Sequence, residues 1–307
     1  MNDYLLMIAG SDIDSFYQIE EFPEASEVTM AQPLGKKVGG CVLNVAAVSA
    51  SKGINTKVLD YLKENDEDTE LLINTLKDKN IDVSNIQYGK DVVNGSCLIM
   101  KCKDEKCIYV IEPKRPFFTV DSQLGELLNN ASFIYSLMHT IMISFEDEKP
   151  ILAAKKAGAK MIFDGSSQYN NPKEIEMLLQ LADGLFINTK AYKVLCEKAG
   201  FDVKDRLLEN GAIFVCITDG SNGAYCYTKN EKLYQKAYKV EVVDSTGAGD
   251  SFAGCFLACL SLGMEIRECL KYASLSGAYC CKGLGGMSAS VPLEVLELFL
   301  KEQNGKK

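Results

Sequence analysis

The chain has 307 residues, 47% of them apolar, and its 42 acidic and 33 basic residues give a formal net charge of −9. This length and apolar content suffice for one large domain or two smaller ones. Basic residues form only short pairs such as Lys36-Lys37 and Lys155-Lys156. Nucleic acid is therefore not an expected partner, because its binders concentrate positive charge. No apolar run reaches the roughly 18 to 20 residues of a membrane span, so no membrane is expected either.

The twelve cysteines bear on the compartment rather than on metal chemistry. Residues 1–6 lack the basic region and the cleavage site of a secretory signal. No Cys-x-x-Cys pair occurs, which argues against a zinc site. We therefore expect free thiols in the reducing cytoplasm. The even spacing of Cys97, Cys102 and Cys107 is interpreted as strand core rather than as a metal site.

The first part of the chain predicts a strand, an irregular stretch and a helix. Residues 4–9 form a short apolar run that ends at Gly10, which indicates a buried strand. Residues 15–37 have mixed polarity and are expected outside the core sheet. Small and apolar residues then run from position 42 to 51 and stop at Gly53, as in a close-packed helix with a glycine stop.

The remainder alternates between strand and helix patterns. Strands are expected at 56–61, 133–137, 161–164, 184–188 and 213–218, hairpins at 95–112 and 223–242, and helices at 69–80, 150–157, 172–181, 191–199, about 250–262, 266–282 and from 292 onward. Strands that alternate with helices predict an α/β fold, in which helices cover both faces of a mostly parallel sheet.

The most informative segment for chemistry is 242–254, a predicted loop that becomes a helix. Gly247 and Gly249, with the small Ala248 between them, allow the backbone to approach a ligand closely. Their N–H groups lie at the expected helix start, where the macrodipole favours anions. Asp250 in the first turn could cap the helix. It could equally accept a hydroxyl proton beside an anion hole, as phosphoryl transfer requires.

This segment closely resembles the Asp-Thr-x-Gly-Ala-Gly-Asp signature of the ribokinase-like carbohydrate kinases, the PfkB family, with Ser245 at the first Thr. The resemblance implies a single kinase domain over residues 1–307. Its fold would be a three-layer α/β sandwich with a small β-lid from about 12–38 and 90–115. It also implies ATP-dependent phosphorylation of a sugar or nucleoside hydroxyl, a primary CH2OH. Asp250 would be the general base, and the amides of residues 247–249 the anion hole.

Two further stretches resemble the acceptor side of the same family. Gly39-Gly40 and Asn44 match its Gly-Gly and Asn signature, which lines the sugar site in the family. Asp14 falls at the family's substrate-binding Asp, and Asp12 replaces an Asn. Carboxylates suit polyols because each oxygen accepts hydrogen bonds from hydroxyls. Without the resemblance, the two acids would be read as an exposed turn.

The nucleotide side is expected in the C-terminal half. Thr218, Gly220 and Gly223 resemble the family's strand end and turn near the ATP phosphates, and Asn188 and Gly285 resemble further nucleotide contacts. The resemblance implies ATP and Mg²⁺ as cofactors.

The family's K⁺ would lie near Asp244, Thr246, Gly286 and Ser290. A homodimer through the lid is also expected from the resemblance.

Two departures from the family pattern stand out. The family's Asn-x-x-Glu motif, which helps to organise Mg²⁺ and phosphate, reads Asn188-Thr189-Lys190-Ala191, so its Glu is missing. The Gly-x-Asp-x-x-Gly turn appears at 64–69 without either glycine. These losses motivate the alternative of a catalytically weak regulatory protein that binds a sugar or nucleoside on the same fold.

Other function classes fit the sequence poorly. A dinucleotide-binding oxidoreductase needs Gly-x-Gly-x-x-Gly after an early strand, where this chain has only Gly10. A P-loop kinase needs Gly-x4-Gly-Lys-Ser/Thr, which Gly35-Lys36-Lys37 does not supply. His139 is the only histidine, so metal sites that need several histidines are excluded, and we interpret it as structural.

Overall fold

The computed structural model describes residues 4–8, 10–103, 105–165 and 171–305. Its centre is an eight-stranded sheet in the order β14-β13-β12-β11-β10-β9-β1-β4. The strands are β1 (Leu5–Ile8), β4 (Thr56–Leu59), β9 (Phe133–Leu137), β10 (Lys160–Gly165), β11 (Gly184–Asn188), β12 (Phe214–Thr218), β13 (Ala224–Tyr227) and β14 (Lys232–Gln235). The pairs from β4 to β12 are parallel, and β13 and β14 extend the sheet antiparallel. The predicted mostly parallel sheet is confirmed.

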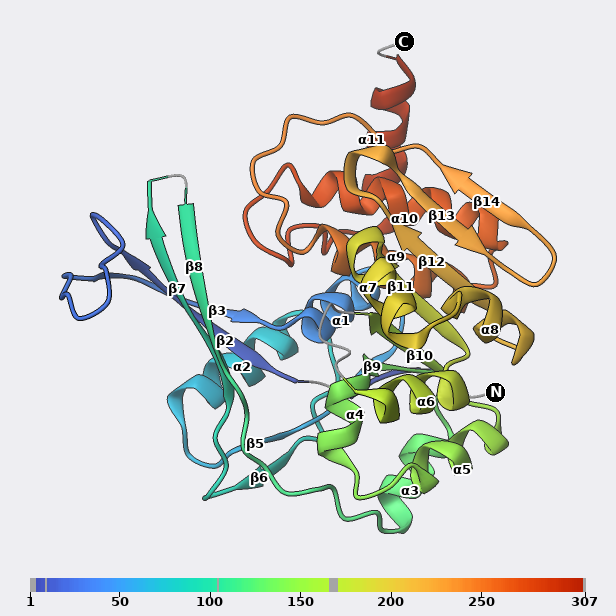
Figure 1. Cartoon of the computed structure of the whole chain (residues 1–307), viewed down its shortest axis with the longest axis horizontal. Helices are drawn as coiled ribbons and strands as arrows, with labels where there is room; N and C mark the ends of the chain where they lie inside the picture. Colours follow the sequence, from blue (N-terminus) through green and yellow to red (C-terminus); the bar gives the residue numbers. More distant parts are fainter. Residues whose placement is uncertain (1–3, 9, 104, 166–170, 306–307) are drawn as a thin grey trace.

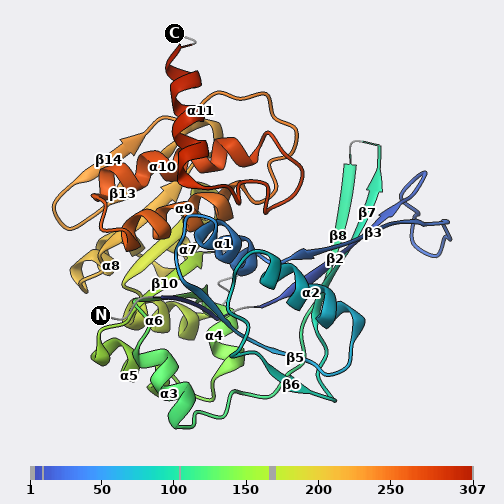
Figure 2. The same cartoon turned by 180° about the vertical axis from the view of Figure 1, so that it is seen from behind.

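Helices cover both faces of this sheet (Figures 1 and 2). One face carries α1 (Cys41–Ala50), α2 (Glu67–Asp78), α9 (Ala248–Ser261), α10 (Ile266–Cys280) and α11 (Leu293–Gly305), and the other α3 (Ser122–Asn129), α4 (Met138–Ser144), α5 (Lys149–Ala157), α6 (Pro172–Leu181), α7 (Thr189–Ala199) and α8 (Val203–Glu209). Strand β1 shows why both faces need cover. Leu5 and Met7 enter one apolar core, and Leu6 and Ile8 enter the other, because successive side chains point to opposite faces.

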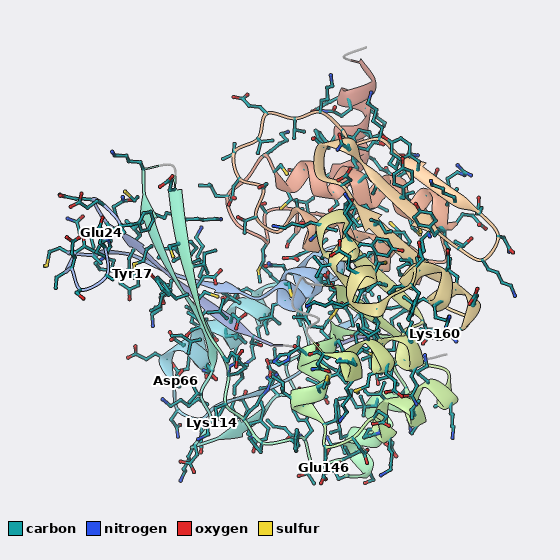
Figure 3. The ribbon with its side chains drawn as sticks, viewed as in Figure 1. Tyr17, Glu24, Asp66, Lys114, Glu146 and Lys160 are labelled. Carbon is teal, nitrogen blue, oxygen red and sulfur yellow. The ribbon has the colours of Figure 1, made fainter. Side chains whose placement is uncertain are left out.

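A second, four-stranded sheet projects from the body in the order β3-β2-β7-β8 (Figure 1). It contains β2 (Asp12–Gln18), β3 (Gln32–Gly39), β7 (Gly95–Cys102) and β8 (Glu105–Ile111). Tyr17 and Glu24 lie on this lid, away from the main body (Figure 3). Near its base, β5 (Tyr61–Lys63) pairs with β6 (Gln87–Gly89). The small β-lid is therefore part of the fold.

The sequence reading differs from the structure in three places. The hairpin expected at 223–242 ends at Gln235, and the chain is irregular from 236 to 247. The helix expected from 250 starts at Ala248, directly after the left-handed Gly247. Helices α3, α4 and α8 were not predicted, because each has only seven or eight residues. Residue 104 of the expected turn and residue 9 of the first strand lie outside the described residues.

Two further predictions concern cysteines and membranes. The twelve cysteines are free thiols. Cys97 and Cys102 lie on β7 and Cys107 on β8, but only Cys102 is buried. The described residues contain no group of three or more His, Cys, Asp or Glu side chains arranged to hold a metal. Among the helices of the described residues, none has the length and apolar character to cross a bilayer.

Candidate active site

The start of helix α9 is shaped by a close glycine contact. Gly247 precedes the helix with φ 77°, a left-handed conformation that L side chains rarely adopt. A Cβ at this position would lie 2.8 Å from the carbonyl oxygen of Gly286 and would overlap its Cα. The amide of Ala248 already donates to the Ser245 carbonyl at 3.2 Å. The first N–H groups of a helix lack intrahelical acceptors. Because the Ala248 amide already has an acceptor, the Gly249 amide is better placed than the Ala248 amide to donate to an anion.

Asp250 does not act as a simple helix cap. Its Oδ2 accepts a 2.7 Å hydrogen bond from the side-chain amide of Asn44 on α1. Burial raises the pKa of Asp250 to about 7; the Asn44 bond opposes this, and the charge of Asp164 adds to it. The structure thus brings together two of the predicted residues, Asp250 and Asn44, from distant parts of the chain. A carboxyl group with a pKa near neutrality is suited to general-base work.

A second carboxylate beside Asp250 was missed by the sequence analysis. Asp164 lies near the carboxyl end of β10 and accepts a 2.7 Å hydrogen bond from the hydroxyl of Tyr135 on β9. Burial raises its pKa to about 6, against the effect of that bond. The Cys41 thiol lies among Asp250, Asp164 and Asp12, and burial together with these charges raises its pKa. The sequence did contain a signal for Asp164, namely an acidic residue at the end of a strand in a predicted parallel sheet. Ligands bind at the carboxyl edge of such a sheet.

The lid brings Asp12 and Asp14 to the same region. Glycines make room for them: a Cβ at Gly39 would lie 2.5 Å from Oδ2 of Asp14, and one at Gly95 would overlap the Asp12 carboxylate. Gly40 has φ 92°. Burial, followed by the charge of Asp14, raises the pKa of Asp12 to about 7.

Cys97 adds a thiol to this wall. Burial raises its pKa to about 12, and it hydrogen-bonds to the Asp14 carboxylate, so the protonated thiol is the donor. The predicted acceptor residues Asp12, Asp14, Gly39, Gly40 and Asn44 therefore lie around one region together with Asp250.

Beneath the lid, a buried ion pair ties the lid to the body. The Asp60 carboxylate accepts hydrogen bonds from the guanidinium of Arg115, the hydroxyl of Ser11 and, at 3.0 Å, the Ser11 amide. The side chains of Arg115 and Asp60 are 3% and 0% exposed. Ser11 precedes the first lid strand, and Arg115 follows the last. Asp60 therefore joins the chain that enters the lid to the chain that leaves it.

Loss of this pair is expected to destabilise the fold strongly. Arg115→Met leaves the Asp60 carboxylate buried without its cation, which costs about 3–5 kcal/mol in the free energy of unfolding. Urea denaturation followed by circular dichroism measures the change. Arg206→Met removes a partner of the exposed Glu209 pair and should change the value by less than about 1 kcal/mol. Equal effects of the two variants would contradict the assigned role of the buried pair.

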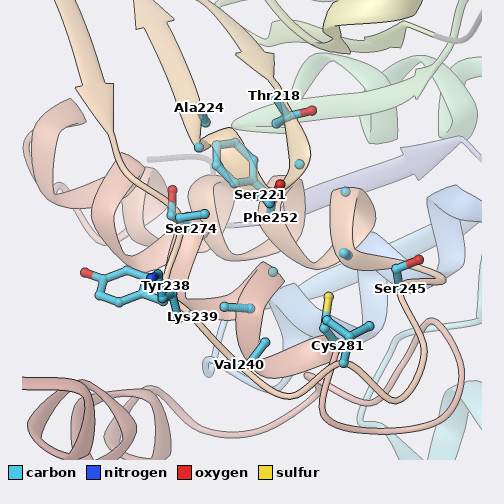
Figure 4. Close-up of a pocket in the computed structure, with 18 of the residues that line it drawn as sticks. Thr218, Ser221, Ala224, Tyr238, Lys239, Val240, Ser245, Phe252, Ser274 and Cys281 are labelled. Atoms are coloured by element: carbon cyan, nitrogen blue, oxygen red, sulfur yellow. The ribbon is translucent and has the colours of Figure 1, made fainter. Parts of the chain in front are cut away.

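A cavity of about 540 Å³ lies beside the start of α9. Three of the residues expected at the nucleotide, Thr218, Gly220 and Gly223, line it together with Ser245 and Gly249. Thr218 and Ser245 are labelled in Figure 4. Apolar side chains, among them Ala224, Tyr238, Val240 and Phe252, form much of its wall. Because Gly249 belongs both to this cavity and to the first turn of α9, the cavity adjoins the Asp250 region.

Two predicted nucleotide contacts are not in this lining. Asn188 pairs in register with Thr218 at the end of β11, but its side chain caps α7 by accepting from the Ala191 amide at 2.9 Å. Gly285 lies outside the cavity, and its amide donates to Oδ2 of Asp244 at 3.1 Å. Ala191 is 2% exposed, packed in the core. At the position where the family has Glu, this chain therefore has Ala191, which carries no carboxylate.

The expected cation region contains an unsatisfied buried oxygen. Ser290 Oγ is buried and has no hydrogen-bond partner among the described atoms. Burial works against ionisation of Asp244, but hydrogen bonds from the Thr246 and Gly285 amides outweigh it and hold its pKa below the usual value. The bond from the Gly285 amide joins the loop of Asp244 to the loop that also contains Gly286 and Ser290.

His139, which the sequence analysis interprets as structural, lies beside Glu174. Its Nδ1 is 3.8 Å from the Glu174 carboxylate, and its side chain is 52% exposed. It is near the start of α4.

Fold and site define the class: an α/β kinase with a small β-lid and a glycine-bounded helix start beside a buried carboxylate. Residues 5–293 of the chain match the pfkB family of carbohydrate kinases. The chain belongs to this family, and it is a PfkB-type carbohydrate or nucleoside kinase.

Similar proteins agree in sequence and in fold. A nucleoside kinase of Methanocaldococcus jannaschii is 24% identical over 283 residues, covering 91% of this chain and 90% of the relative. The Arabidopsis thaliana ribokinase complexed with ribose and ATP has a TM-score of 0.83 at 22% identity, covering 98% and 99% of the two chains. A putative ribokinase II from E. coli with ATP and Mg²⁺ has a TM-score of 0.80 at 19% identity, covering 98% and 99%. These structures establish the ribokinase-like fold.

Proposed function

We propose that this kinase transfers the γ-phosphoryl group of ATP to a hydroxyl, a primary CH2OH, of an uncharged sugar or nucleoside. The observation that carries the proposal is Asp250, which lies in the first turn of α9 and bonds to Asn44 instead of capping the helix. Asp250 accepts the proton of the attacking hydroxyl. The amides at the start of α9, Gly249 foremost, stabilise the charge on the transferred group.

The charges around Asp250 support a neutral acceptor. Asp12, Asp14 and Asp164 surround the region and outnumber its cations, of which Arg115 is paired with Asp60 and Lys106 of the lid lies near Asp14. Ionised carboxylates accept hydrogen bonds from sugar hydroxyls and repel a phosphate or carboxylate on the acceptor. The relatives include a nucleoside kinase and a ribokinase complexed with ribose and ATP, which are both consistent with a ribose-like acceptor.

The 540 Å³ cavity is the proposed ATP site. Its apolar walls would enclose the base, and the turn of Thr218, Gly220 and Gly223 would lie along the phosphates. Mg²⁺ enters as part of the MgATP substrate. Since Ala191 replaces the family Glu, phosphate oxygens and water would be its main ligands, as is common for Mg²⁺.

We also propose a monovalent cation, K⁺, between the loops of Asp244 and Ser290. The buried Oγ of Ser290, which has no hydrogen-bond partner among the described atoms, and the ionised Asp244 fit such an ion.

A homodimer through the lid is proposed on separate grounds. Strand β8 is an unpaired sheet edge whose apolar residues, such as Ile108 and Val110 at 47% and 63% exposure, suit a second copy. Light scattering would detect it. The free thiols fit a cytoplasmic site of action.

The test is ATP-to-ADP turnover with Mg²⁺, with and without K⁺, against free sugars, sugar phosphates and nucleosides. Turnover with one uncharged acceptor supports the proposal. Turnover only with a phosphorylated acceptor contradicts the charge argument. Thermal stabilisation by an acceptor without turnover would favour the regulatory alternative, for which the missing Glu at Ala191 is the structural motive.

The kinase activity, measured as kcat/KM, should decrease below neutral pH. The base is functional only when ionised, so kcat/KM is expected to rise through the pKa of Asp250, about 7, and then to level off. Asp164→Asn removes a charge that contributes to this raised pKa, so the rise should move to lower pH. Asp14→Asn serves as the control, which should lower kcat/KM without moving the profile. An unmoved profile for Asp164→Asn would show that the two carboxylates are not coupled.

A further inference from the structure

A buried lysine lies at the end of α1, close to the loop behind the anion hole. Lys52 is 8% exposed, and its Nζ donates to the carbonyl oxygens of Val291 at 2.6 Å and Ala289 at 3.2 Å. It also donates to the hydroxyl of Ser51 at 3.2 Å. Lysine is almost never buried unless it is paired. Here the hydrogen-bond partners among the described residues are neutral oxygens. Burial lowers the pKa of Lys52, and the nearby Cys255 and Cys259 thiols oppose this shift.

The carbonyls that Lys52 holds end a glycine-rich loop, residues 283–291, between α10 and α11. The loop contains Gly283, Gly285 and Gly286, and glycine loses more conformational freedom on folding than any other residue. Ser51 Oγ donates to the same Val291 carbonyl at 3.1 Å. One end of α1 thus anchors a loop whose own sequence favours many conformations.

The middle of this loop packs closely against Asn44 and Gly247, which adjoin the proposed base and anion hole. A Cβ at Gly286 would lie 2.9 Å from Oδ1 of Asn44 and would overlap its Nδ2, and that Nδ2 donates to Asp250. Gly286 also lies against Gly247, which leaves no room for a side chain there. The Gly285 amide bonds to Asp244. A displaced loop would therefore disturb both the base and the anion hole.

Apolar packing alone gives no reason for an ammonium here. Taking an ammonium out of water is expensive unless it is compensated by close partners, and an apolar side chain would fill the same space without that penalty. What the ammonium adds is directional attraction to the carbonyls of residues 289 and 291, the neighbours of Ser290.

We propose that Lys52 is a positioning residue for phosphoryl transfer, a cation built into the chain that holds loop 283–291 against Asn44 and Gly247. The inference rests on the proposed function of Asp250 for its effect on turnover. Its structural part, the anchoring of the loop, does not depend on that function.

Two variants separate the charge from the packing. Lys52→Met keeps the length and the apolar body of the side chain but removes the charge and the donors. We expect kcat to fall by about tenfold to a hundredfold, the scale of a small misplacement of reacting groups. The KM for ATP should change less than kcat, because no residue of loop 283–291 itself lines the cavity. Lys52→Ala leaves space for a small cation, so methylammonium should restore part of the lost kcat.

Ser49→Ala is the matched control. Ser49 lies on the same helix, is buried, and donates to the Gly254 carbonyl at 3.0 Å rather than to the loop. This variant should not respond to methylammonium. Unchanged kcat in Lys52→Met, or a loss in Lys52→Ala that methylammonium does not relieve, would overturn the proposed role of the ammonium.

Hydrogen exchange decides the structural part even if no acceptor is found. In Lys52→Met the amides of Gly285 and Gly286 should exchange faster than in the wild type, while Ser49→Ala leaves them unchanged. Wild-type exchange at both glycines in Lys52→Met would overturn the anchoring, whatever the kinase assay shows. Failure of the proposed function alone would leave faster exchange but no turnover in any variant, including the wild type.

Discussion

Asp250→Asn is expected to lower kcat by about 10²–10⁴-fold, the usual contribution of general-base catalysis. The amide has nearly the same shape as the carboxylate, and its oxygen still accepts the hydrogen bond that Asn44 donates at 2.7 Å. It cannot accept the proton of the attacking hydroxyl. Binding of ATP and acceptor should persist, so isothermal titration together with steady-state kinetics measures the separation of binding from turnover.

The same substitution is expected to stabilise the fold above neutral pH. The pKa of Asp250 is raised from its ordinary value of 3.8 to about 7, with burial as the main cause. Between these values the folded state binds more protons than the unfolded state, so the stability of the wild type falls as pH rises. Asp250→Asn removes this dependence. Its melting temperature should therefore exceed that of the wild type at pH 8, and the difference should shrink toward pH 4.

Asp121→Asn is the control for the chemistry of the exchange. Asp121 caps α3 by accepting from the Leu124 amide at 2.8 Å, a role that Asn fills equally well. Both kcat and stability should remain near wild type. Near-normal turnover of Asp250→Asn would rule out the proposed mechanism, since no change of fold could hide the loss of a base.

Gly247→Ala is the second change with a large expected effect. The new methyl group would meet the backbone of Gly286, and the residue would have to keep φ 77°. Either the loop or the start of α9 must move, which displaces the Gly249 amide from the transferred group. Loss of one such donor lowers kcat by about 10²–10³-fold, and the same should be measured here.

Gly263→Ala separates the two causes. Gly263 follows α9 with φ 75°, almost the same backbone strain, but open space surrounds its Cβ position. Both variants should lose about 1–2 kcal/mol of stability from the left-handed conformation, and only Gly247→Ala should also lose turnover. If both variants kept wild-type kcat, the contact between Gly247 and Gly286 would have no part in the reaction.

The sequence alone was sufficient for features encoded over short stretches of chain. The glycines at 247 and 249 and the acid at 250 lie within four consecutive residues. A helix start with a carboxylate beside it could therefore be predicted without knowledge of the fold. Alternating apolar strands and amphipathic helices likewise predicted the covered parallel sheet, because burial on both faces leaves a direct trace in composition.

The tertiary structure alone decided which groups meet Asp250. Asn44, Asp164 and Tyr135 come from α1, β10 and β9, and no local pattern relates them to one another. Parallel strands bring their carboxyl ends to one edge of the sheet regardless of the distance along the chain. Lys52 illustrates the same limit. In the sequence it looks like a polar helix end, and only the approach of loop 283–291 encloses it. Burial also decides the pKa of Asp250, since the loss of water around a carboxylate depends on all its neighbours.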